Sequence, residues 1–272
     1  YVVGIALLHD FEGTTFFGFA PPRDIWRQTV IAIIVAGSFA TATGWVCLRT
    51  RGVGFIMITL AFAQMLFYFF VSLRRYNGED GIALWYRSSG VILDLESSSV
   101  LHYLALFWLL VFLALALAIY HSRFGRVLRA ARDNERRVRA LGFPVERFRL
   151  VAYVISAAAT AVAGVLLANA SWFVGPSYLA WPMSGQLIVM VVLGGMGTIY
   201  GPVLGATLYL LLEQFLPEGL DLILAGAGDH WKLFLGPLFV LLALYVRRGL
   251  FDALALWRPG RTRLKTAGAW GE

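Results

Sequence analysis

A run of 63 residues without a charged side chain, from Leu150 to Leu212, most constrains what this chain can fold into. The 272 residues are 59% hydrophobic and 14% charged, and their mean hydropathy is +0.72. A soluble domain of this length leaves much of its surface in water and cannot bury that much apolar surface. The single cysteine, Cys47, has no partner within the chain, which excludes a disulfide-stabilised scaffold. The sequence therefore predicts an integral membrane protein with an all-α fold.

Uncharged blocks long enough to cross a bilayer recur along the chain. A helix needs about 20 apolar residues to cross the hydrocarbon core, because its backbone polar groups must be bonded within the helix. Such blocks run over Gln28–Leu48, Gly52–Leu73, Ser97–Tyr120 and Leu150–Phe173, and the shorter Leu233–Val246 qualifies if the three preceding residues lie at the interface. We expect a single transmembrane domain over 1–272, a polytopic helix bundle. The apolar start, 1–8, is expected to end a helix that begins, with other helices, before this sequence.

Basic residues define the orientation of these spans. The segments 49–52, 121–149 and 247–272 hold 17 of the 23 lysines and arginines, but five acidic residues. The positive-inside rule makes this side cytoplasmic, and the direction of successive spans agrees with that assignment. The same bias explains the net charge of +7, and the loop 121–149 is too short to form a nucleic-acid-binding module.

The segment Met183–Leu212 is apolar but is interrupted by the sequence GGMGTIYGPVLGA. If the other spans are oriented correctly, this segment enters and leaves the membrane on the same side, as a broken, re-entrant helix pair. Pro202 is suited to the first turn of a helix that begins near Gly201. Small residues let two helices approach closely, and irregular backbone in a membrane must be covered by protein or line a path. Two alternative roles are predicted, helix packing or a place on the translocation pathway, for Gly194, Gly195, Gly197, Thr198, Gly201 and Gly205.

The loop 121–149 carries nine arginines and has helical periodicity between Phe124 and Leu141. Gly142 and Pro144 are expected to end that helix. A basic amphipathic helix can lie on anionic headgroups, whereas small residues and mixed charges favour docking to a cytoplasmic partner. One helical face is expected to hold Ala130, Ala131, Asn134, Val138 and Leu141. The candidate docking residues are Arg132, Asp133, Asn134, Glu135, Arg136, Ala140, Leu141 and Gly142.

Other polar residues give weaker signals. Thr59 and Gln64 lie inside a predicted span, so we expect them to bond another helix or to face the pathway. Glu213 is expected at the outer interface, and the outer loop 74–87 is either solvated or in contact with an external partner. The four histidines have no metal-ligand spacing, so we predict no metal site and no catalytic residue.

Taken in order, these segments resemble the integral-membrane permease subunits of branched-chain amino acid ABC importers. The resemblance covers Arg49 to Leu250. It rests on RTRGVGFIMITLAFAQML, on FGRVLRAARDNERRVRALGF, and on SGQLIVMVVLGGMGTIYGPVLGA with the later RRGL.

The resemblance implies a permease subunit in the inner membrane that is not an enzyme and binds no cofactor. Its implied partners are a second related permease, two cytoplasmic ATPases that carry ATP and magnesium, and a periplasmic solute-binding protein. It also implies that 123–142 is the coupling segment, moved as a rigid lever by the ATPases. The resemblance leaves several classes of transported solute as alternatives: branched-chain amino acids, urea, short amides and aromatic acids. A channel or secondary transporter is disfavoured, because Leu150–Leu212 has no ionisable residue to couple ions. A membrane-embedded enzyme is a third class of function. It would need groups such as His102 and Glu213 to cluster around a cavity.

Overall fold

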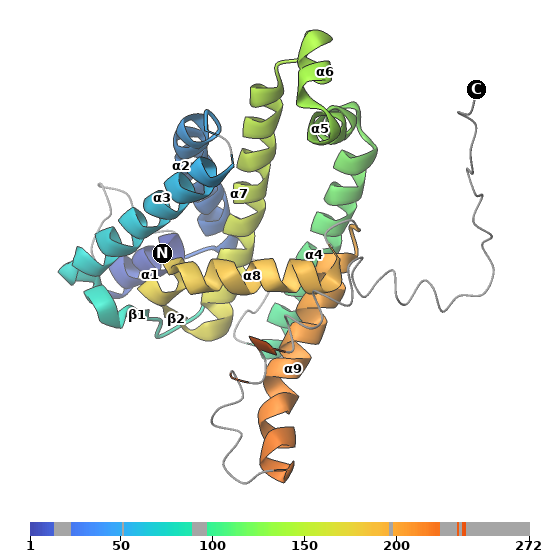
Figure 1. Ribbon diagram of the computed structural model, residues 1–272. Helices are drawn as coiled ribbons and strands as arrows, with labels where there is room; N and C mark the ends of the chain where they lie inside the picture. The colour runs from blue at the N-terminus through green and yellow to red at the C-terminus, as the bar shows by residue number, and fades with distance from the viewer. Residues whose placement is uncertain are drawn as a thin grey trace, which may run out of the picture. The chain divides into compact units, whose positions relative to one another are not determined.

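The computed structural model describes residues 1–13, 23–50, 52–88, 97–195 and 198–223, with 233, 236 and 237 (Figure 1). The chain divides into two compact units, Tyr1–Met183 and Ser184–Glu272, and each is described by itself. The single domain predicted over 1–272 stays a prediction.

Four helices of the first unit are long and apolar enough to cross a membrane. They are α2 (Ile25–Cys47), α3 (Val53–Ser72), α4 (Ser98–His121) and α7 (Val145–Ser171). They confirm four of the predicted spans and the all-α polytopic bundle. The predicted span Leu233–Val246 lies almost entirely outside the described residues.

Helix α7 begins at Val145, five residues before the predicted start at Leu150. Its 27 residues are about 40 Å long at 1.5 Å per residue, which exceeds the roughly 30 Å hydrocarbon core. The additional turn carries Glu146, Arg147 and Arg149, so it continues the helix beyond the apolar span. Hydrophobic length alone cannot locate a helix start of this kind.

Helices α2 and α7 pack along each other and form the centre of the first unit. Near the end of α2, a Cβ added to Gly44 would lie 2.9 Å from side-chain atoms of Leu150 and Tyr153, which shows how closely α2 approaches the start of α7. The main apolar cluster adds the short helix α1 (Val2–Phe11), where the sequence predicted the end of a helix. Its buried members are Val3, Leu7, Ile25, Ala32, Ile82, Leu84, Leu101, Leu104, Val165, Ala168 and Val174.

Helices α3 and α4 turn most of their apolar side chains outward. None of the described residues of α3 is buried, and α4 buries Leu101 and Leu104. An apolar surface of this size is unfavourable in water but is ordinary against lipid or another membrane subunit.

A short two-stranded sheet joins two parts of the first unit that are distant in sequence. Strand β1 (Ile82–Ala83) pairs antiparallel with β2 (Phe173–Val174), with Ile82 opposite Val174. Single-turn helices η1 (Arg74–Tyr76), η2 (Gly78–Asp80) and η3 (Pro176–Leu179) flank it. The segment after α3 and the segment after α7 therefore lie together, as the predicted topology requires for the outer side. We call this the outer end, and the opposite end of α7 the inner end (Figure 1).

At the inner end, the predicted single helix over 124–141 is wrong: two helices form, α5 (Arg123–Asp133) and α6 (Glu135–Ala140). Asn134 breaks the run with extended dihedrals, φ −151° and ψ 94°. Its side-chain oxygen accepts a hydrogen bond from the backbone N–H of Arg137 at 3.1 Å. Asparagine favours such an N-cap over a position inside a helix, which explains the break.

The described part of the second unit contains most of α8 (Trp181–Gly194) and α9 (Gly201–Ile223). Helix α9 begins at the predicted residue, with Pro202 in its first turn. The 14 residues of α8 are about 21 Å long, too short to cross the hydrocarbon core alone. The same-side entry and exit of this pair stays a prediction.

Candidate functional site

The inner end of the first unit holds α5 and α6 against the start of α7. Ala131, Val138 and Val145, one from each helix, form a small buried cluster. The expected face is therefore divided: Ala131 and Val138 point into this cluster, whereas Ala130, Asn134 and Leu141 are exposed. The expected continuous small-residue docking face is corrected accordingly, because the break at Asn134 gives α5 and α6 different axes.

Ion pairs of Glu135 and Arg139 tie α6 to the start of α7. Its Oε1 lies 2.8 Å from Nη2 of Arg139, one turn along α6, and its Oε2 lies 3.0 Å from Nη2 of Arg149 on α7. Nη2 of Arg139 also lies 2.9 Å from Oε1 of Glu146. The Glu135 side chain is 19% exposed, so these pairs are partly shielded from water. Glu135 thus acts within the chain to position α6.

The turn after α6 is fixed by two backbone hydrogen bonds. The N–H of Gly142 donates to Arg139 O at 2.9 Å, and the N–H of Phe143 donates to Val138 O at 3.4 Å. Gly142 has φ +85°, as this Schellman motif requires. The turn presents Leu141, which is 71% exposed, together with Phe143. We call Ala140–Phe143 the inner tip.

Seven of the eight predicted docking residues are exposed, and Glu135 is the half-buried exception. The exposed residues are Arg132, Asp133, Asn134, Arg136, Ala140, Leu141 and Gly142. An apolar tip flanked by arginines offers a partner both burial and charge. A role in docking stays a prediction at this point.

Three of the predicted glycines lie at a close crossing of α8 and α9 in the second unit. A Cβ on Gly194 would overlap the carbonyl oxygen of Gly201, and one on Gly205 would overlap that of Met190. A Cβ on Gly201 would lie 2.6 Å from Gly195 O. The obstructing atoms belong to the backbone, so these glycines serve helix packing.

The remaining residues of this group are at the turn. Gly195 follows α8 with φ +106°, and Thr198 Oγ1 donates to Gly195 O at 3.4 Å. Gly197 lies outside the described residues. A place for this turn on the translocation pathway stays a prediction.

Thr59 does not bond another helix as expected. Its Oγ1 donates to Phe55 O at 3.0 Å and lies 2.9 Å from Ile56 O, within its own helix. A threonine in a helix often satisfies its hydroxyl in this way. Gln64 is half-buried on α3, and its bond to another helix stays a prediction.

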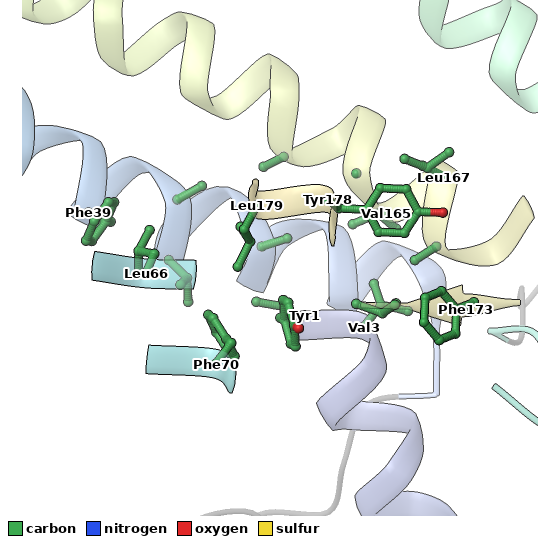
Figure 2. A pocket seen from close by; sticks show the side chains of 18 residues that line it. Tyr1, Val3, Phe39, Leu66, Phe70, Val165, Leu167, Phe173, Tyr178 and Leu179 are labelled. Atoms are coloured by element: carbon green, nitrogen blue, oxygen red, sulfur yellow. The ribbon is translucent and has the colours of Figure 1, made fainter. Parts of the chain in front are cut away.

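An apolar cavity of about 420 Å³ lies between α1, α2, α3, α7 and the β2–η3 segment (Figure 2). Its lining includes Phe39, Leu66, Phe70, Val165 and Leu179, and the hydroxyls of Tyr1 and Tyr178 are the polar side-chain atoms among its lining residues. The cavity can hold an apolar group. It offers no charged side chain to a carboxylate or an ammonium group.

Sequence reasoning missed a buried polar cluster at the outer end. Gln28 of α2, Ser88 and Asn169 of α7 are each 1% exposed or less. Ser88 Oγ donates to Gln28 Oε1 at 2.5 Å, and the Ser88 N–H donates to Asn169 Oδ1 at 2.9 Å. Asn169 inside an uncharged run was an available signal, because a polar side chain in a membrane span needs a partner.

A second cluster closes the outer end around Asp10. Oδ2 of Asp10 accepts from Tyr86 Oη at 2.6 Å and from Arg23 Nε at 2.5 Å. Burial, together with the adjacent Asp10 carboxylate, raises the pKa of Tyr86 to about 12. The hydrogen bond and the charge of Asp10 also raise the pKa of Arg23. These groups are bonded to one another, which suits a structural role.

Across the described residues, no group of three histidine, cysteine or acidic side chains could hold a metal ion. A membrane enzyme was expected to need a cluster of groups such as His102 and Glu213. These two residues lie in different compact units, so the structure does not give them as one cluster.

Comparison with known proteins places this architecture in a family. The family described as "Branched-chain amino acid transport system / permease component" matches residues 2–243. The chain is 26% identical over its whole length to the high-affinity branched-chain amino acid transport system permease protein LivM of Salmonella typhimurium strain LT2. It is 35% identical over 43% of its length to the LivH permease of Escherichia coli strain K12, covering 39% of that protein. It is 28% identical over half its length to the ribose import permease protein RbsC of Escherichia coli strain K12, covering 42% of that protein.

The chain spans about 65% of the length of the LivM proteins it matches. No solved structure matches it. The family match and the four apolar helices make it a multi-pass protein of the inner membrane. The chain belongs to the family of permease components of branched-chain amino acid transport systems.

Proposed function

We propose that this chain is one permease subunit of an ATP-driven importer of branched-chain amino acids. Two relatives that match its whole length are named as permeases for these solutes. A relative that is similar over half of this chain is named as a ribose import permease, so the cargo needs its own test. Urea, short amides and aromatic acids therefore remain alternative cargoes to be tested beside leucine.

The observation that carries the proposal is the inner tip. Leu141 is exposed at a turn that two hydrogen bonds and a glycine with positive φ hold in place. The turn is attached to α7 by the Ala131–Val138–Val145 cluster and by the ion pair of Glu135 with Arg149. A rigid apolar projection beside a membrane-crossing helix is suited to receive force from a cytoplasmic ATPase that carries ATP and magnesium.

Other partners fit the remaining surfaces. A second, related permease would pack on the apolar outward faces of α3 or α4. A periplasmic solute-binding protein would meet the outer end, where Trp85 is 74% exposed. The subunit itself then binds no cofactor and performs no chemical step.

Leu141→Asp tests the docking role, because it places a charge on the tip without disturbing a buried contact. We expect ATPase subunits to co-purify with the wild-type membrane complex and to be lost at least tenfold from the variant, as for a central interface residue. Leu141→Met, which keeps an apolar side chain, should retain them. Uptake of labelled leucine should fall in parallel.

Undiminished ATPase association in Leu141→Asp would reject the inner tip as the docking site. The cargo is tested separately with the wild-type complex. Competition of labelled leucine uptake by valine and isoleucine is expected, and stronger competition by urea, a short amide, phenylalanine or ribose would reassign the cargo.

A further inference from the structure

A cationic group lies where α4 ends and α5 begins. Tyr120 is in the last turn of α4, and α5 starts three residues later at Arg123. The guanidinium carbon of Arg129 lies 3.8 Å from the centroid of the Tyr120 ring. Nη1 of Arg129 is buried and has no hydrogen-bond partner among the described residues. The stacked guanidinium therefore retains an unused donor.

Two further arginines share this edge of α5. Arg123, Arg126 and Arg129 are spaced by three residues, so they follow one another along the helix surface. None of the ion pairs formed between described residues involves them. The acid that follows on this edge, Asp133, is one turn beyond Arg129 and forms no ion pair with it. We call Arg123, Arg126 and Arg129 the α5 arginine row.

The position of the row directly after a predicted span leads us to expect it at the depth of the cytoplasmic membrane interface. Tyr120 lies in the last turn of a helix long and apolar enough to cross a membrane. A similar pair lies at the end of α2, where the guanidinium carbon of Arg49 is 3.7 Å from the centroid of the Trp45 ring. Tryptophan and tyrosine concentrate at headgroup level, and arginine side chains extend toward that level. The phosphates of membrane lipids are found at the same depth.

We propose that the α5 arginine row binds the phosphate of an anionic membrane phospholipid. A guanidinium donates paired hydrogen bonds to phosphate oxygens, and the row supplies three such groups that form no ion pair among the described residues. Docking of a protein is less suited to this row than to the inner tip, because the row begins only two residues after a span. In Figure 1, α5 adjoins the end of α4, whereas α6 extends beyond the start of α7.

The test measures how much phosphatidylglycerol the purified membrane complex retains, by mass spectrometry after delipidation and titration. Each basic residue near an anionic surface contributes about fivefold to affinity, so Arg126→Gln with Arg129→Gln should weaken retention roughly twenty-five-fold. Arg137→Gln with Arg147→Gln removes the same charge from exposed positions of α6 and α7 outside the predicted docking residues, and is the matched control. It should leave retention within about twofold of wild type.

Three further arms identify the ligand. Phosphatidylcholine should not replace phosphatidylglycerol, and inorganic phosphate at matched concentration should not displace it. Tyr120→Phe keeps the ring under Arg129 and should retain the lipid, whereas Tyr120→Leu should weaken retention.

Equal losses in the two double variants would overturn the proposal, since general charge rather than the row would then hold the lipid. Displacement by inorganic phosphate would also overturn it, because the site would then take a free anion. The lipid proposal and the proposed transport function can fail separately. ATPase association can be lost while lipid retention persists, and lipid retention can be lost while the ATPase subunits stay bound.

Discussion

A single methyl group at Gly194 should disrupt the crossing of α8 and α9. Alanine normally stabilises a helix by up to about 1 kcal/mol relative to glycine. At Gly194, however, the new Cβ would overlap the carbonyl oxygen of Gly201 and lie 3.0 Å from the Gly205 nitrogen. These are backbone atoms, so α9 as a whole must move. Overpacking of this kind costs about 1–3 kcal/mol.

Gly185 provides a matched control on the same helix, because a Cβ there has nothing within 4 Å. Gly185→Ala should be neutral or stabilising, so the two variants should differ by about 1–4 kcal/mol. Thermal unfolding of the purified subunit in detergent measures this, and a gap on the order of 10 °C is expected. A melting temperature for Gly194→Ala at or above wild type would refute the close crossing.

Two other predictions concern the two ends of the first unit. The pKa of Tyr86 is about 12 in the fold against an ordinary value of 10, so its contribution to stability is complete below pH 10 and is lost as the pH rises through 12. Tyr86→Phe should flatten the fall in melting temperature over this range; an unchanged fall would count against it. At the inner end, Glu135→Gln should speed hydrogen exchange of the 138–141 amides about fivefold, by removing two ion pairs worth about 1 kcal/mol together. Unchanged exchange would show that these pairs do not hold α6.

Four spans could be predicted because their information is local. An uncharged block of about 20 residues has few alternatives in a membrane, and α2, α3, α4 and α7 follow such blocks. The start of α9 was predictable for a similar reason, since Pro202 fits a first turn. The extension of α7 to Val145 depends on the burial of Val145 against Ala131 and Val138. These three residues lie outside the uncharged block from which the span was predicted.

The candidate site was predicted in composition but not in shape. The sequence indicates a basic helical segment that ends just before Gly142, and in the structure α6 ends at Ala140. It does not indicate that Asn134 would cap a second helix, because a capping asparagine and a helical one have the same place in the periodic pattern. The outer cluster was missed for a different reason: Gln28, Ser88 and Asn169 meet only once the bundle has formed.

These two ends are joined by one helix, which leads to a prediction about the proposed transport. Arg149, bonded to Glu135, and Asn169, bonded to Ser88, lie twenty residues apart on α7, about 30 Å along its axis. Sites so far apart contribute additively to stability. If α7 carries movement from the inner tip to the outer end as one body, however, breaking either attachment already decouples the two ends.

The double variant Glu135→Gln with Asn169→Leu should therefore unfold with the sum of the two single losses, within about 0.5 kcal/mol. Its leucine uptake should be no lower than that of the worse single variant. Additive losses in both stability and uptake would mean that the two ends act independently. In that case α7 does not transmit the movement, even if the ATPase docks at the inner tip.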